Sequence, residues 1–170
     1  NALIGEANLT FDGSTLGVNG AAIFNESGAD KDFRVESDGQ ENMLVVNGGL
    51  NRVGVGEDNP LGTLHVKTAD TGASSVSGNA DEFVIENTGN VGMTIQSAND
   101  GVGNVYFGDV ANGSIGRLSY DHSSNFMSFN ANASERMRIN SEGNTLINET
   151  TAHGENTGRL QVTGRASSNI

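Results

Sequence analysis

The sequence predicts an all-β protein. Three observations indicate this fold class: short runs in which apolar and polar residues alternate, turn residues between the runs, and a shortage of large apolar side chains. Of the 170 residues, 35% are hydrophobic and 5% are aromatic, whereas 24 are glycine and none is tryptophan. Alternation with a period of two is the pattern of a strand that buries one face and exposes the other. A chain with so little apolar surface either stays disordered or shares its core with identical neighbours.

The expected strands follow one another between turns rich in glycine and asparagine. Pro60, the only proline, lies in a loop-like segment over residues 58–62. Glycine recurs too often for a long helix, so strands are expected throughout. The alternating runs occupy residues 33–36, 63–67, 137–140 and 159–163. The turn segments, which supply the positive φ angles of tight turns, are 38–39, 47–49, 88–90, 112–113 and 142–144.

An internal repeat divides the chain. Residues 33–43 match residues 83–93 at an offset of 50 positions. The match continues beyond these segments, because Val45 corresponds to Ile95 at the same offset. A looser third copy runs over residues 136–147. The expected organisation is an N-terminal β segment (1–32), a first fibre repeat (33–82), a second fibre repeat with an aromatic-rich knob (83–132), and a third, partial repeat with a tail (133–170).

The repeats also indicate the kind of assembly, because units of short strands cannot bury themselves singly and must stack or intertwine. A one-chain solenoid would stack rungs of regular length, whereas the apolar pairs here are unevenly spaced and each cluster is short. This pattern favours an elongated, intertwined homotrimeric β-fibre, in which three chains share a narrow core and cover each other's strand edges. The residues expected in that core are Phe33, Val35, Met43, Val53, Val55, Leu64, Val66, Phe83, Ile85, Met93, Met137 and Ile139.

Charge and composition exclude several classes of function. The formal net charge is −12, and nine Lys and Arg residues spread along the chain do not form a phosphate-binding surface, so no nucleic-acid partner is expected. No run approaches the roughly 18 apolar residues of a membrane span, so no membrane insertion is expected. Because the chain has no cysteine, a disulfide framework and a thiolate metal site are both excluded.

The sequence favours a protein that is not an enzyme and needs no cofactor or metal. Acidic pairs such as Glu57/Asp58 and Asp81/Glu82 fit solvated charge better than the paired carboxylates of a glycosidase. No serine or threonine lies in a nucleophile motif. His65 lies between Leu64 and Val66, so its side chain is expected to face outward, opposite the apolar face. A site on a threefold axis at His65 is an alternative, because symmetry would triple a single ligand.

Five aromatic residues gather in the second repeat: Tyr106, Phe107, Tyr120, Phe126 and Phe129. This cluster is expected to be a well-packed knob where the fibre thickens. The alternative is a glycan-stacking patch, because aromatic rings are common in sugar recognition. The candidates for such surface recognition are Tyr106, Tyr120 and Phe126.

Several longer strings resemble a known family. Residues 21–37, the segment Asn51 to Gly56 followed by residues 60–66, and residues 116–139 are similar to segments of bacteriophage tail fibre proteins of the marine phage and cyanophage type. These fibres carry an Asn-x-Val-Gly-Ile-Gly motif and a Leu-His-Val motif, and the likeness covers roughly residues 18–163. One departure lies at residues 144–148, where a second glycine-spaced copy of the motif would be expected.

The resemblance implies a homotrimeric, elongated β-structure that contributes to host-cell attachment. Its partners would be other copies of the chain, other phage tail or virion proteins, and a bacterial surface glycan or protein receptor. The protein would act outside the cell as part of the virion. Many members also carry a self-cleaving C-terminal chaperone domain, which is expected to have been removed or to lie outside this chain. The alternatives are a self-assembling bacterial surface or extracellular filament protein and, less favoured, a polysaccharide depolymerase.

Overall fold

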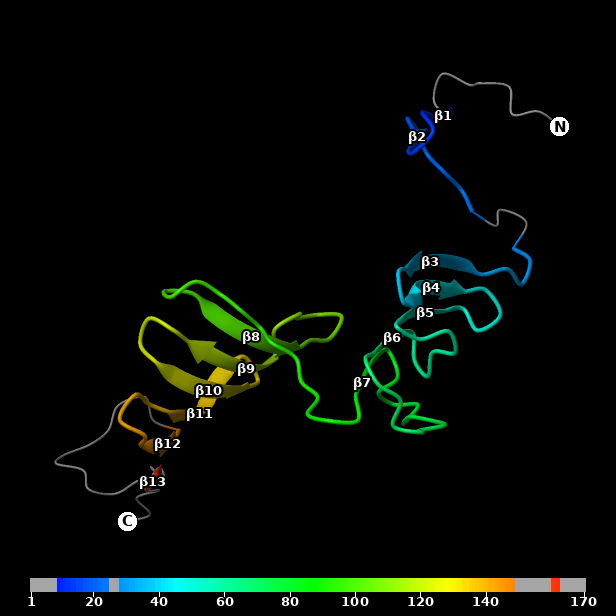
Figure 1. The fold of residues 1–170 in the computed structure, drawn as a ribbon. Helices are drawn as coiled ribbons and strands as arrows, with labels where there is room; N and C mark the ends of the chain where they lie inside the picture. Colours follow the sequence, from blue (N-terminus) through cyan, green and yellow to red (C-terminus); the bar gives the residue numbers. More distant parts are fainter. Residues whose placement is uncertain (1–8, 25–27, 149–159, 163–170) are drawn as a thin grey trace, which may run out of the picture. The chain divides into compact units, whose positions relative to one another are not determined.

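A computed structural model describes residues 9–24, 28–148 and 160–162 of the chain. Within these residues the secondary structure consists of strands and no helix, which confirms the all-β prediction. The strands form a two-stranded, a five-stranded and a six-stranded sheet (Figure 1). The chain divides into two structural units, Asn1–Gly92 and Met93–Ile170.

The first unit contains the two smaller sheets. β1 (Leu9–Phe11) and β2 (Leu16–Val18) form an antiparallel pair. The five-stranded sheet has its strands in sequence order: β3 (Phe33–Ser37), β4 (Gln40–Asn47), β5 (Arg52–Val55), β6 (Leu64–Lys67) and β7 (Phe83–Glu86). β3, β4 and β5 pair antiparallel, whereas β5, β6 and β7 pair parallel.

Turn chemistry explains the antiparallel half of this sheet. Gly39 has a φ of +83° and closes the β3–β4 hairpin, and Asn51 has a φ of +56° just before β5. Both lie where glycine or asparagine is favoured, because other residues rarely adopt positive φ. The parallel half needs longer connections, since consecutive parallel strands start at the same end of the sheet. Residues 56–63 and 68–82 supply them.

The connection between β5 and β6 folds back over the sheet. Gly54 lies directly beneath it, where a Cβ atom would collide with the carbonyl oxygen of Glu57 and crowd the ring of Pro60. Pro60 is fully buried, and Arg52 Nη1 donates a 2.8 Å hydrogen bond to its carbonyl oxygen. The segment of residues 56–62, called the cover loop below, therefore shields the part of one face of the five-stranded sheet that surrounds Gly54.

The second unit contains the six-stranded sheet. Its strands are β8 (Val102–Phe107), β9 (Gly116–Asp121), β10 (Phe126–Ala131), β11 (Ser134–Ile139), β12 (Thr145–Ile147) and β13 (Leu160–Val162). The strands follow sequence order across the sheet, and all neighbours are antiparallel except β12 and β13. Asn125 and Asn132 adopt positive φ in the turns on either side of β10. The predicted strand over residues 159–163 corresponds to β13.

The hydrophobic core of the single chain is very small. Apart from Pro60, the buried apolar side chains among the described residues are Val45 and Leu146. Many large apolar side chains on the strands stay exposed instead. The sheets therefore leave apolar surface uncovered that a self-contained domain would bury.

Candidate functional site

The five-stranded sheet carries an uncovered apolar face. The register across the strands places Phe33, Val46, Val53, Leu64 and Phe83 in one continuous row. In the adjacent row Val35 pairs with Leu44, and Val66 lies between Val55 and Ile85. Because side chains two residues apart on a strand point the same way, both rows lie on one face.

Exposure shows that the described chain leaves this face open. None of the residues in the two rows is buried. Phe33 is 37% exposed, Val46 is 42% exposed and Phe83 is 49% exposed. Contiguous apolar surface of this kind marks an interaction site in a folded protein. The two rows are called the apolar face of the five-stranded sheet below.

The six-stranded sheet repeats the arrangement. One row across five strands contains Val105, Leu118, Phe129, Met137 and Ile147. None of them is buried, and Phe129 is 39% exposed. The opposite face is mixed: it carries the buried Leu146, and it includes Ser119 and Ser128, which are buried and joined by a 2.7 Å hydrogen bond between their hydroxyl groups. In both sheets, then, the apolar face is the open one.

The structure places most of the expected core residues on these two faces. On the first sheet they are Phe33, Val35, Val53, Val55, Leu64, Val66, Phe83 and Ile85, and on the second Met137 and Ile139. Met43 lies on β4 with the parity of Val45, away from the apolar face, and is 45% exposed. Met93 lies outside any strand and is 60% exposed. Val46, Leu44 and Leu118 were not among the expected residues, although strand alternation would have found them.

The aromatic residues proposed for surface recognition do not form one site. Tyr120 lies on the apolar face of the second sheet, where its hydroxyl donates a 3.3 Å hydrogen bond to Asn125 Oδ1. Tyr106 and Phe126 lie on the opposite face, in rows set apart by the register of β8, β9 and β10. Tyr106 is 50% exposed, whereas the Phe126 ring lies 4.1 Å below the guanidinium of Arg138.

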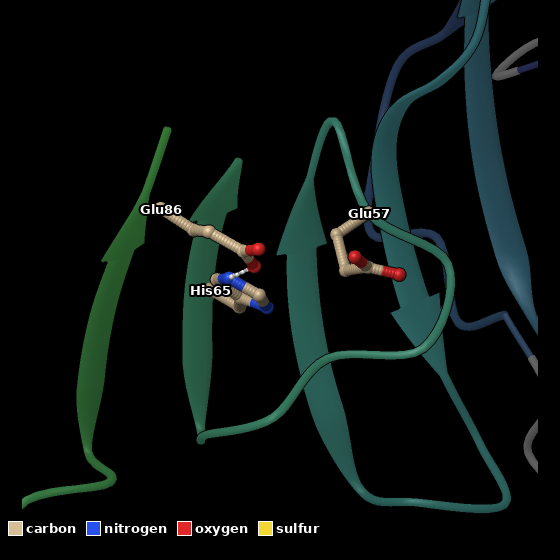
Figure 2. A group of neighbouring side chains, drawn as sticks. All are labelled: Glu57, His65 and Glu86. Carbon is tan, nitrogen blue, oxygen red and sulfur yellow. Dashed lines mark ion pairs between the residues drawn. The ribbon is translucent and has the colours of Figure 1, made fainter. Parts of the chain in front are cut away.

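The covered face of the first sheet holds a buried polar cluster made of Glu57, His65 and Glu86 (Figure 2). His65 on β6 is completely buried, so the expectation that it faces outward to solvent is wrong. Its side chain does lie opposite the apolar rows, as alternation requires, but the cover loop lies over it. Leu61 of that loop donates its backbone N–H to His65 Nδ1 at 3.3 Å.

Each carboxylate of the cluster has its own donors. Glu86 Oε1 accepts hydrogen bonds from the Thr71 amide at 2.6 Å and from the Thr71 hydroxyl at 2.7 Å. Glu57 Oε1 accepts a 2.7 Å hydrogen bond from the Asn59 amide, and Glu57 Oε2 forms an ion pair with the Lys67 ammonium. The carboxylates are therefore engaged by groups of the same chain.

These contacts shift three pKa values. Burial by itself raises the pKa of Glu57, but the Lys67 ammonium and the Asn59 amide lower it below its ordinary value. The pKa of Glu86 is lowered, chiefly by the Thr71 hydroxyl and amide. The pKa of Lys67 is raised by its contact with Glu57, against the opposing effect of burial. All three groups are therefore held in their charged forms near neutral pH.

The same cluster has residue types that can bind a metal, and their potential ligand atoms lie within 4.8 Å of one another. Two observations count against that role. The Leu61 N–H occupies the Nδ1 lone pair of His65, which places the proton of the neutral ring on Nε2, the atom that a metal would need. The Lys67 ammonium already neutralises Glu57.

His65 Nε2 lies 3.0 Å from Glu86 Oε2, although the contact lacks the alignment of a directed hydrogen bond. The His65 ring nitrogen therefore lies in direct contact with the negatively charged Glu86 carboxylate. This contact and the hydrogen bonds and ion pair of Glu57 and Glu86 form a polar network. The network holds the cover loop and the segment around Thr71 onto the sheet. We interpret the cluster as structural.

Comparison with known proteins adds no assignment. No protein-family model matches the sequence, and no curated protein gives a significant match. In the described part of the chain, no helix has the length and apolar character to cross a membrane.

Proposed function

We propose that this chain is a non-catalytic structural segment of a homotrimeric β-fibre, of the type that bacteriophage tails use for attachment to the host cell. The observation that carries the proposal is the open apolar face on each of the two larger sheets. Self-association would bury these faces, and the burial of apolar surface is the main driving force of such assembly. The sequence resemblance to bacteriophage tail fibre proteins supports two further parts of the proposal: that the assembly contains three copies and that the protein comes from a phage.

The distribution of charge and polarity supports the same proposal. On the polar side of the first sheet, the cover loop of the same chain already buries His65 and lies over Gly54. The net charge of −12 would keep an assembled fibre soluble and limit clumping between fibres. Attachment through such a fibre is multivalent, because each assembly presents its surface loops in several copies.

Light scattering after size-exclusion chromatography tests the assembly directly. We expect a mass of three chains of 17.6 kDa each, stable on dilution. A folded species with the mass of one chain would overturn the proposal, and a mass that grows with protein concentration would favour an open-ended filament instead. Incubation with bacterial capsule polysaccharide should release no reducing ends, whereas their release would indicate a depolymerase.

A further inference from the structure

One segment of the chain has the sequence of a strand and no strand partner. In residues 91–96, Val91, Met93 and Ile95 alternate with Gly92, Thr94 and Gln96. The three large side chains are 56%, 60% and 45% exposed, respectively. The backbone of residues 91–96 makes no hydrogen bond to the part of the chain that the structure describes. An alternating apolar segment with unpaired backbone groups has the properties of a strand that lacks its neighbours.

The internal repeat shows what the neighbours should be. Residues 91–96 correspond to residues 41–46 of β4, which is hydrogen-bonded to β3 on one side and to β5 on the other. Val45 of β4 is 1% exposed, whereas its equivalent Ile95 is 45% exposed. Because β3 corresponds to β7 in the repeat, the missing neighbour of residues 91–96 has the sequence of β7.

The turn that closes the first hairpin is not repeated after β7. In the first repeat Gly39, with a φ of +83°, closes the hairpin and brings Ser37 opposite Gln40. The equivalent Gly89 does not adopt a positive φ. The Asn87 side-chain amide instead donates a 3.1 Å hydrogen bond to the carbonyl oxygen of Asn90. The positive-φ turn that joins β3 to β4 thus has no counterpart at Gly89.

The outer edge of β7 is free in the described structure. β7 is the last strand of the five-stranded sheet and pairs only with β6. An edge strand presents unpaired N–H and C=O groups, to which an extended segment of another chain can add.

We propose that residues 91–96 are completed as a strand by a second copy of this chain, pairing antiparallel with the free edge of β7 in that copy. The register follows from the first repeat, where Arg34 pairs with Val45 and Phe33 with Val46. The equivalent pairs between copies are Val84 with Ile95 and Phe83 with Gln96. This inference rests on the proposed self-association and adds to it a strand exchanged between copies. Ile95 then packs beside Val84, as the buried Val45 does beside Arg34.

Disulfide trapping tests the pairing, and the absence of native cysteine keeps the experiment clean. Val84→Cys and Ile95→Cys are placed in separate chains with different tags, which are denatured, mixed, refolded together and oxidised. We expect a disulfide that links the two tags, because opposed positions on antiparallel strands lie within disulfide reach. Arg34→Cys with Val45→Cys in one chain is the matched control, and it should close within that chain.

Each result decides the proposal. Two results would overturn the exchanged strand. One is a Val84→Cys/Ile95→Cys double variant that forms its disulfide only within one chain. The other is a mixture of the two single-cysteine chains that forms no disulfide between chains while the Arg34→Cys/Val45→Cys control closes. If Val84→Cys impairs folding, Glu82→Cys with Ser97→Cys probes the same register two positions further along. Light scattering on the same samples separates the two proposals: a trimer without the link contradicts the exchanged strand alone, whereas a monomer contradicts self-association.

Discussion

Gly54 determines how closely the cover loop can approach the five-stranded sheet. The Glu57 carbonyl oxygen and the Pro60 ring lie where a Cβ atom on Gly54 would be. The neighbours are a backbone atom and a rigid ring, so the loop must move to accommodate even one methyl group.

Gly54→Ala should therefore lower the free energy of unfolding by about 1–3 kcal/mol, the usual range for overpacking. Urea unfolding followed by circular dichroism measures the change. Gly78→Ala is the control, because a Cβ atom at Gly78 meets open space and its φ is not positive. Equal unfolding midpoints for the two variants would contradict the close approach of the cover loop to the sheet.

The charged residues around His65 give stability a defined dependence on pH. The folded-state pKa values of Glu57 and Glu86 lie below 4.5, so their contribution is full above pH 4.5 and is lost as the pH falls through the folded-state values. The pKa of Lys67 lies above 10.5, so its contribution is full below pH 10.5 and is lost as the pH rises through the folded-state value.

We expect the contribution of this cluster to the free energy of unfolding to be constant between about pH 4.5 and pH 10.5. The contribution should decrease at lower pH and at higher pH. Urea titrations across the pH range measure it. In Lys67→Met the alkaline decline due to Lys67 should disappear, whereas the acid decline due to Glu86 should remain. An unchanged alkaline decline in the variant would show that Lys67 does not contribute through its charge.

At the scale of elements, the five-stranded sheet combines two faces of opposite character. Val53 and Val55 on β5 contribute to the apolar face, while Gly54 between them lies under the cover loop. The cover loop of the same chain lies over part of one face, and the proposed assembly would cover the other. A change on the apolar face should therefore alter assembly more than it alters the chain's own polar network.

The double variant Val53→Asp/Val55→Asp should fail to form the trimer, because burial of unpaired carboxylates costs several kcal/mol at each copy. Analytical ultracentrifugation measures the loss. Ser74→Asp/Ser75→Asp adds the same charge on an exposed loop and should assemble like the unmodified chain. Normal assembly of the Val53/Val55 variant would show that another surface joins the chains.

Sequence patterns predicted the strands well and the coverage of their faces poorly. Alternation at residues 33–36 and 63–67 located β3 and β6, and the Asp38-Gly39 turn located the hairpin between β3 and β4. Alternation also placed His65 correctly on the face opposite Leu64. It could not show that this face is buried, because that depends on the cover loop folding over Gly54. Loop closure is a tertiary event with no period in the sequence.

At the scale of the whole chain, the described residues combine exposed apolar faces with a very small core, so the proposed assembly would make stability depend on partners. Val45 and Leu146 are the buried hydrophobic side chains of the described residues, besides Pro60. A single copy would gain little from its own core. In the proposed assembly, contacts between copies would then supply much of the free energy that stabilises the folded state.

The melting temperature should therefore rise with protein concentration, since association stabilises the folded state by mass action. Differential scanning calorimetry over a hundredfold concentration range measures the effect. The Val53→Asp/Val55→Asp variant should melt at a lower temperature that does not change with concentration. A concentration-independent melting temperature for the unmodified protein would mean that each chain folds by itself.

The cover loop has a further consequence for the order of folding events. It joins β5 to β6, which are consecutive strands, so its contacts need only a short stretch of chain to close and should form rapidly. In the proposed assembly, the apolar faces of separate chains would meet only by collision. Refolding should show a fast phase with a rate independent of protein concentration, followed by a slow phase that accelerates as the concentration rises. A polar, loop-bound sheet formed in the first phase would be the intermediate that awaits its partners.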